Sequence, residues 1–276
     1  MAWGLYKKMV IADRLAQIVD YSYANIGTQN GLSILFGTCC YSFQIYCDFS
    51  GYSDIAIGAS RIMGIKLMDN FNSPYFSKSI SEFWKRWHIS LSTWFRDYLY
   101  ISLGGNRVAI PRLYLNLFIV FLLSGLWHGA NWTFIVWGAL HGFYLIFAIE
   151  KDKLFRPINF KNRYAEYFYN SIKISTTFLL VTFAWIFFRS PSISIAFDVI
   201  KKIAQTTFTD KLLTPFSWQE IVLATTLVCL LLVKEKYASI INTKNSIQFW
   251  FVFAATLFVI YLLGVSNQNQ FIYFQF

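Results

Sequence analysis

Charged residues are scarce in this sequence: they make up 14% of its 276 residues, whereas ordinary soluble domains contain about 25%. Hydrophobic residues reach 56%, and several apolar segments approach the roughly 20 residues that span a bilayer. This composition indicates a polytopic protein embedded in the membrane lipid bilayer. The net charge of +10 is explained by Lys and Arg in cytoplasmic loops, and so apolar a chain is not expected to bind nucleic acid.

Residues that hold metals or drive hydrolysis are also few. The four cysteines form no C-x-x-C pair, which argues against a disulfide framework. The three histidines lack metal-ligand spacing, so no metal site is expected. Neither a G-x-S-x-G elbow nor a phosphate-binding Gly-Lys-Ser/Thr loop occurs, so a serine hydrolase and a nucleotide-driven pump lack essential parts. Acid–base chemistry by histidine remains. The histidines are His88, His128 and His141.

Hydrophobic periodicity predicts an all-α fold, a polytopic transmembrane helical bundle with re-entrant segments and an amphipathic interfacial helix. One integral-membrane domain is expected over residues 1–276. A surface helix is predicted at 192–205, and an amphipathic helix at 1–20 with Lys7 and Lys8 as interface anchors. The predicted spans are 32–46, 114–127, 132–149, 171–188, 220–233 and 249–263.

A polar, turn-rich run at 47–54 follows the first predicted span. Such a run predicts a bent or re-entrant segment, which is tolerated where protein or water covers it. Its two carboxylates, Asp48 and Asp54, have two interpretations. They pair with loop arginines as structural ion pairs, or they carry protons through the membrane.

The stretch 80–98 has apolar residues at helical spacing for five turns. Ser79 and Glu82 form the S-x-x-E pattern that starts a helix, and Gly104-Gly105 ends it. A Trp-rich basic helix of this kind lies at a membrane interface or packs under a helix bundle. His88 lies on its polar stripe, either as a solvated interface histidine or as a site residue. That stripe consists of Ser81, Lys85, His88, Ser92 and Arg96.

His128 lies between Gly125 and Gly129 in an otherwise apolar region. An ionisable group at membrane depth is expensive and indicates function; the alternative is a core histidine bonded to a backbone carbonyl. The preceding span of about 14 residues covers roughly 21 Å, less than the roughly 30 Å hydrocarbon core. A tight hairpin therefore places His128 within the membrane, and the basic stretches 61–112 and 150–170 are expected on the cytoplasmic side.

A neutral imidazole in a dry cavity takes a proton from an alcohol as the alcohol attacks an acyl carbonyl. The resulting oxyanion needs hydrogen-bond donors. Candidates are Asn131, the indole N–H of Trp127 or Trp132, and backbone amides near Gly129. His141 is expected to be a packing residue.

Five ordered blocks of sequence carry a resemblance to a known family. They are QIYCDFSGYSD at 44–54, NFNSPY at 70–75, FWKRWHISLS at 83–92, RDYLYISLGGNR at 96–107 and SGLWHG at 124–129. They resemble the membrane-bound O-acyltransferase family, especially its alginate O-acetyltransferase branch. The likeness covers about residues 3–142.

The resemblance implies that an acyl group, acetyl in this branch, passes from a cytoplasmic thioester such as acetyl-CoA to hydroxyls of an extracytoplasmic polysaccharide. It implies a bacterial inner-membrane enzyme without a bound cofactor, working with an extracytoplasmic SGNH-type partner. His128 corresponds to the essential catalytic histidine and His88 to a second catalytic position. The residues expected to contact substrate are Asn131, Trp127, Lys85, Arg96 and Ser92.

Other functions stay open at this point. A secondary transporter or export component would use intramembrane His and Asp as a proton relay, and a non-catalytic scaffold would only hold a partner. Within the family, the Leu-Gly-Gly-Asn-Arg block favours acetyl transfer over D-alanyl transfer to teichoic acid. Family members carry further spans before the position of Gly4, so the chain is expected to be the C-terminal portion of a longer enzyme.

Overall fold

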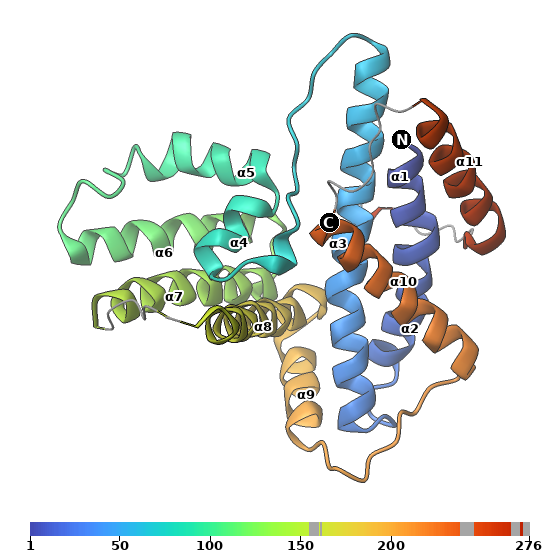
Figure 1. Ribbon diagram of the computed structural model, residues 1–276. Helices are drawn as coiled ribbons and strands as arrows, with labels where there is room; N and C mark the ends of the chain where they lie inside the picture. Colours follow the sequence, from blue (N-terminus) through green and yellow to red (C-terminus); the bar gives the residue numbers. More distant parts are fainter. Residues whose placement is uncertain (155–159, 161, 238–245, 266–270, 273–276) are drawn as a thin grey trace. The chain divides into compact units, whose positions relative to one another are not determined.

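The computed structural model describes residues 1–154, 160, 162–237, 246–265 and 271–272. These residues form helices and contain no strand (Figure 1), which confirms the all-α prediction. The chain divides into two compact units. The first combines Met1–Met68 with Asp198–Phe276, and the second is Asp69–Phe197. The middle of the sequence is thus a unit inserted between the two ends of the first, and the prediction of one domain stays a prediction.

Four helices among the described residues are long and apolar enough to cross a membrane. They are α6 (Ile110–Trp127), α7 (Trp132–Leu154), α8 (Arg163–Arg189) and α11 (Ser246–Leu263). They confirm the spans predicted at 114–127, 132–149, 171–188 and 249–263. The segments 32–46 and 220–233 are helical, within α3 (Gly31–Ile62) and α10 (Trp218–Lys236), but these two helices are not among the four. Helix α9 (Ile193–Ala204) matches the surface helix predicted at 192–205.

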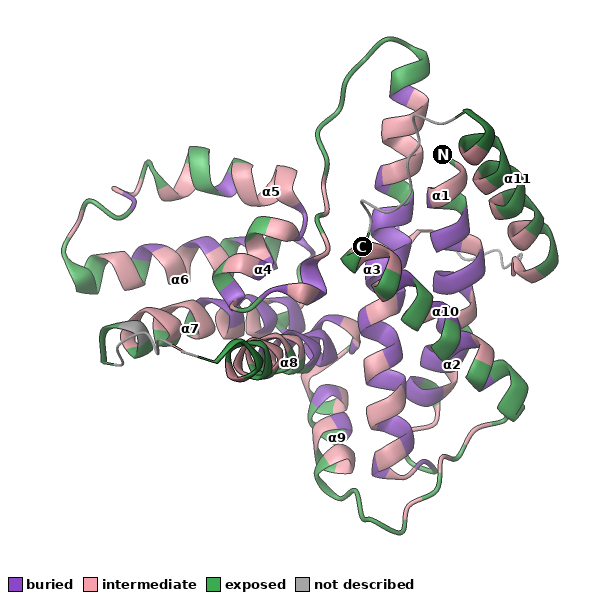
Figure 2. Ribbon diagram, viewed as in Figure 1, coloured by how far each residue is buried: buried purple, intermediate pink, exposed green. Residues whose placement is uncertain are grey.

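In the first unit, the N-terminal helical stretch packs along α3. It consists of α1 (Ala2–Leu5), a π-helix η1 (Tyr6–Ala12) and α2 (Asp13–Ala24). The prediction that Lys7 and Lys8 anchor it at the interface is wrong, because both are buried, at 5% and 8% exposure. Figure 2 shows that much of this helical stretch is buried. Their ammonium groups face carboxylates, which offset the cost of burying them.

Helix α3 runs without interruption through 47–54, so the predicted bent or re-entrant segment is wrong. The polar residues find partners inside the helix stack instead of breaking the helix. Lys8 Nζ lies 2.5 Å from Asp48 and Lys7 Nζ lies 2.9 Å from Asp54; the expected arginine partners are lysines. Gly51 allows close approach, since a Cβ there would lie 2.8 Å from a carbonyl oxygen of the N-terminal helix.

In the second unit, α6 and α7 form a hairpin, and other helices of the unit pack against it. Helix α4 (Ile80–Arg86) contacts α7 and α8, and α8 also contacts α7. Helix α5 (Ile89–Trp94) continues into a π-helix, η3 (Phe95–Tyr100), which contacts α6. A short 3-10 turn, η2 (Pro74–Phe76), packs on α4 and α8.

The helix predicted at 80–98 is broken in the middle. Its start is as predicted, because Ser79 Oγ accepts the Glu82 N–H at 3.1 Å. Helix α4 then ends at Arg86, and His88 has φ +44°, in the left-handed region. Buried Trp87 packs on Trp185 of α8 with ring centroids 5.2 Å apart. Packing of this indole outweighs the helical periodicity.

Candidate active site

His128 ends α6 at the turn of the α6–α7 hairpin. Gly129 has φ +150°, a conformation that glycine adopts without steric cost, and α7 begins at Trp132. The two backbones touch just before this turn: a Cβ on Gly125 would meet the Phe134 carbonyl. Gly125 thus permits the close approach of the two helices, and Gly129 permits the break between them.

Aromatic side chains surround the His128 ring, which is 6% exposed. The centroids of Trp127, Trp137 and Phe188 lie 5.1–5.2 Å away, and that of Phe134 lies 6.3 Å away. Burial among apolar rings, with a smaller contribution from the neighbouring His88, lowers the pKa of His128 to about 3. The imidazole is therefore neutral at pH 7, and a neutral imidazole carries a lone pair on one of its two nitrogens.

His88 occupies the two-residue break between α4 and α5 and is 9% exposed. The interpretation as a solvated interface histidine is therefore wrong. Burial lowers its pKa to about 4, so it too is neutral at pH 7. Its ring centroid lies 6.5 Å from that of Trp127, which in turn lies 5.2 Å from that of His128. The fold brings the two predicted catalytic histidines to one cluster, with Trp127 next to both.

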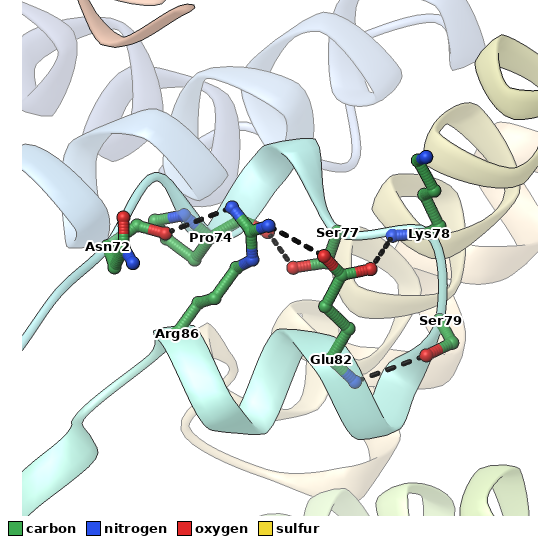
Figure 3. A network of polar contacts seen from close by, with 7 residues as sticks. All are labelled: Asn72, Pro74, Ser77, Lys78, Ser79, Glu82 and Arg86. Carbon is green, nitrogen blue, oxygen red and sulfur yellow. Dashed lines mark hydrogen bonds and ion pairs between the residues drawn. The ribbon is translucent and has the colours of Figure 1, made fainter. Parts of the chain in front are cut away.

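A polar network fastens the segment before α4 to that helix (Figure 3). The Arg86 guanidinium donates to Glu82 at 2.6 Å and to the Asn72 carbonyl at 3.4 Å. The other Glu82 oxygen accepts the Lys78 N–H at 2.8 Å. This network ties the segment that carries Asn70 to the break that carries His88.

A cavity of about 430 Å³ lies beside the histidine cluster. Lys85, Ser92 and Arg96, all predicted to contact substrate, line it together with apolar groups. Neither predicted catalytic histidine lines it, but Ile89 directly follows His88 and Ser124 lies about one helical turn before His128. The apolar lining consists mainly of Trp84, Ile89, Leu91, Phe95, Leu117, Val120, Phe121 and Leu145.

Other predicted site residues have different surroundings. The Asn131 amide donates to the Pro191 carbonyl at 2.9 Å and accepts the Thr133 N–H at 3.1 Å, so both of its ends serve the fold. Trp132 is 72% exposed. Asp48 and Asp54 belong to the first unit, in the ion pairs described above. Within the described residues, no group of three His, Cys, Asp or Glu side chains could hold a metal ion.

Sequence reasoning missed two parts of the cluster. Asn70, whose side-chain oxygen lies 3.3 Å from His88 Nδ1, belongs to the NFNSPY block, which was the available signal. Trp137 and Trp185 stack at 5.8 Å beside His128, but nothing in the apolar runs distinguishes them from core residues. His141 is fully buried and accepts the Trp84 indole N–H at 3.2 Å.

The residues of the histidine cluster lie in a part of the chain that matches one known protein family. A family model described as membrane-bound O-acyltransferase matches residues 4–190. The chain is 52% identical over 193 residues to a probable alginate O-acetylase of Pseudomonas syringae, covering 70% of this chain and 35% of that protein.

Two further relatives have other printed activities. A peptidoglycan O-acetyltransferase of Helicobacter pylori is 43% identical over 201 residues, covering 72% of this chain and 36% of that protein. A teichoic acid D-alanyltransferase of Bacillus subtilis is 43% identical over 110 residues, covering 37% and 27%. The chain spans about a third of the length of the O-acetyltransferases it matches. The chain, a multi-pass membrane protein, belongs to the membrane-bound O-acyltransferase family.

Proposed function

We propose that the protein is a membrane O-acyltransferase that moves an acetyl group from a cytoplasmic thioester toward hydroxyls of an extracytoplasmic polysaccharide. The observation that carries this proposal is the pair of buried, neutral histidines that meet at Trp127. Both lie within residues 4–190, the part matched to the family. General acid–base catalysis requires a base that is deprotonated at the working pH.

His128 acts as the base in this scheme. Its lone pair takes the proton of the acceptor hydroxyl while the hydroxyl oxygen forms a bond to the thioester carbonyl carbon. The tetrahedral intermediate then loses the C–S bond, and the leaving sulfur receives the proton from the imidazolium. The products are an ester and a thiol, and the histidine returns to its neutral form. Exclusion of water by the aromatic rings prevents hydrolysis of the thioester.

We assign stabilisation of the oxyanion to Trp137 instead of Asn131. The Asn131 amide is engaged at both ends. The Trp137 indole N–H is buried, has no acceptor among the described residues, and belongs to a ring 5.2 Å from that of His128. A buried donor that is otherwise unsatisfied stabilises a developing negative charge strongly.

The cavity beside the histidines is our candidate site for the thioester donor. Acetyl-CoA carries phosphates and a flexible arm, which suits two cations above an apolar lining. Lys85 and Arg96 supply the cations, and Ser92 supplies a hydroxyl. Arg96 also pairs with the neighbouring Asp97 at 2.7 Å, so donor binding competes with this exposed ion pair.

The relatives support acetyl as the acyl group in this proposal. The matches to O-acetyltransferases extend over 193–201 residues, against 110 for the D-alanyltransferase, which favours acetyl transfer. Alginate and peptidoglycan are the acceptors named for those proteins. We place the enzyme in the bacterial inner membrane and expect an extracytoplasmic SGNH-type partner to complete the transfer.

Replacement of His128 by Ala tests the proposal. Because general base catalysis contributes roughly 10²–10⁴-fold, polysaccharide acetylation should fall by that factor. The measurement is the acetyl content of the polysaccharide in cells whose only such enzyme is the variant, together with thioester consumption in isolated membranes.

The matched control is Tyr164→Phe, since Tyr164 is 86% exposed on α8; it should retain wild-type acetylation. A folded His128→Ala protein that acetylates at the full level would refute the role of His128. Proton-coupled flux of a substrate without thioester consumption would indicate the transporter instead.

A further inference from the structure

Asn70 caps helix α5 from a distant part of the chain. The residue before α5, His88, makes no side-chain capping bond. Instead, the Asn70 main-chain carbonyl accepts the Ile89 N–H at 3.0 Å, and the Asn70 side-chain oxygen accepts the Ser90 N–H at 3.0 Å. These N–H groups would otherwise lack partners at the helix start. The strained backbone of His88 is thus held by a residue 18 positions earlier.

The orientation of the Asn70 amide follows from this cap. The two ends of an asparagine amide are distinguished by their partners. The Ser90 N–H can only donate, so the amide atom 3.0 Å from it is the oxygen, Oδ1. The Ser90 hydroxyl also lies 2.7 Å from Oδ1 and donates its single proton to it.

The same oxygen faces the ring of His88. Oδ1 lies 3.3 Å from His88 Nδ1, and Ser90 Oγ lies 3.4 Å from it. Both oxygens can only accept here, because Oδ1 has no proton and the Ser90 proton is already used. A bare Nδ1 would face two lone pairs, whereas a protonated Nδ1 donates to them.

We propose that Asn70 is a positioning residue that holds His88 in the tautomer protonated at Nδ1, so that Nε2 presents the lone pair. The tautomer itself does not depend on the proposed function. The inference rests on that function only for the catalytic use of the Nε2 lone pair. The orienting group of a histidine sets which nitrogen is available. Here the orienting group is a neutral amide with Ser90 as its support, in place of a carboxylate.

Several titratable groups lie around this break among the described residues. His128, at the end of α6, has a pKa that the charge of His88 lowers. On α4, Arg86 is paired with Glu82, and Lys85 lines the cavity. The segment of Asn70 brings an amide to the ring, and α5 brings the Ser90 hydroxyl. A carboxylate introduced at position 70 would therefore place a negative charge where the amide oxygen now lies, 3.3 Å from His88 Nδ1.

Nitrogen NMR tests the tautomer directly. The chain contains three histidines, so few signals have to be assigned. The protein is labelled with ¹⁵N-histidine in detergent micelles, and His88→Asn identifies the His88 signals. At pH 7 the His88 shifts should report a protonated Nδ1 and a bare Nε2. In Asn70→Ala the two tautomers should become mixed. Protonated Nε2 in the wild type, or an unchanged spectrum in a folded Asn70→Ala protein, would overturn the inference.

The variant Asn70→Asp separates positioning from capping. Aspartate caps helices as well as asparagine does, so α5 should be retained. Its charge beside Nδ1 should raise the pKa of His88 by roughly 1–3 pH units. The same shift should appear in the acid limb of the pH profile of kcat/KM, and Asn70→Ala should lower kcat/KM by about 100-fold.

Asn72→Asp is the matched control. Asn72 lies two residues after Asn70, and its hydrogen bonds with Arg86 use the main-chain atoms of Asn72. Its pH profile should keep the wild-type acid limb. If the pKa of His88 is the same in Asn70→Asp as in the wild type, Asn70 is only a structural cap and the inference is wrong. The NMR readout needs no acyl transfer, so a failure of the proposed function would be seen separately, as a wild-type protein without transferase activity.

Discussion

Burial of two imidazoles decides the charge of the candidate site. The pKa of His88 is lowered to about 4 and that of His128 to about 3, in each case chiefly by loss of contact with water. In the unfolded chain a histidine has a pKa near 6.5. Below pH 6.5 the unfolded chain therefore binds protons that the folded protein excludes, and stability falls as pH falls.

We predict that the free energy of unfolding decreases by roughly 1.4 kcal/mol per pH unit for each such histidine, from pH 6.5 toward the folded pKa. His88→Asn should remove the contribution of one histidine. Between pH 7 and pH 5, the free energy of unfolding of this variant should therefore fall by about 2 kcal/mol less than that of the wild type. The measurement is chemical denaturation in detergent at several pH values. Identical losses for both proteins would contradict the low pKa of His88.

The backbones of α6 and α7 touch at a pair of glycines. A Cβ on Gly125 would meet the Phe134 carbonyl, and one on Gly138 would meet the Phe121 carbonyl. Small residues of this kind let membrane helices approach closely. Since His128 follows Gly125 by three residues, this contact also determines where the imidazole lies.

We predict that Gly125→Ala destabilises the protein by about 1–3 kcal/mol through overpacking and lowers acetylation by displacing His128. Gly27→Ala is the control, because no atom lies within 4 Å of a Cβ placed there, and it should unfold like the wild type. Thermal unfolding in detergent and acetyl content of the polysaccharide report the two effects. A wild-type melting temperature for Gly125→Ala would mean that the helices can separate without cost.

The sequence was sufficient to predict which segments are helical, but not where a helix is continuous and where it breaks. The period of the apolar residues identified α6, α7, α8 and α11. It predicted a break in α3 where none occurs and a continuous helix through His88 where one ends. Both errors come from partners distant in sequence. Lys8 pairs with Asp48 inside the continuous α3. At the break, Trp87 packs on Trp185 and Asn70 caps α5.

At the scale of the molecule, the first unit is held together by buried charge. Lys8 bridges Asp13 at 3.0 Å and Asp48 at 2.5 Å, and Asp48 also accepts the Ile272 N–H at 2.7 Å. The cluster thereby joins the two ends of the chain that make up this unit. Lys7, the preceding residue, pairs with Asp54, whose side chain is 35% exposed.

We predict that Lys8→Met costs roughly 3–5 kcal/mol, because two buried carboxylates lose their cation. Lys7→Met should cost less, since Asp54 can reach water. Denaturation of both variants in detergent compares two buried lysines at adjacent positions. Adding Asp48→Asn should recover part of the loss in Lys8→Met; equal losses for the two lysines would show that packing, not charge, matters here.

The family and the two catalytic candidates were predictable from ordered blocks of residues, and comparison confirms the family. The partners of those candidates were not. Asn131 was predicted to bind substrate from its neighbourhood to His128, yet its amide is used by the fold. Trp137 and Asn70, which lie beside the histidines, were missed because contacts across helices leave no periodic signal.

The left-handed backbone of His88 also governs how any mutational scan of this position must be interpreted. At φ +44°, most residues cost roughly 1–2 kcal/mol, whereas Asn, Asp and His adopt this region several-fold more often than others. Valine, isoleucine and threonine at position 88 would add backbone strain to the loss of the imidazole. Inactivity after such replacements therefore does not separate catalysis from strain. Asparagine is the replacement that deletes the imidazole and keeps the main chain.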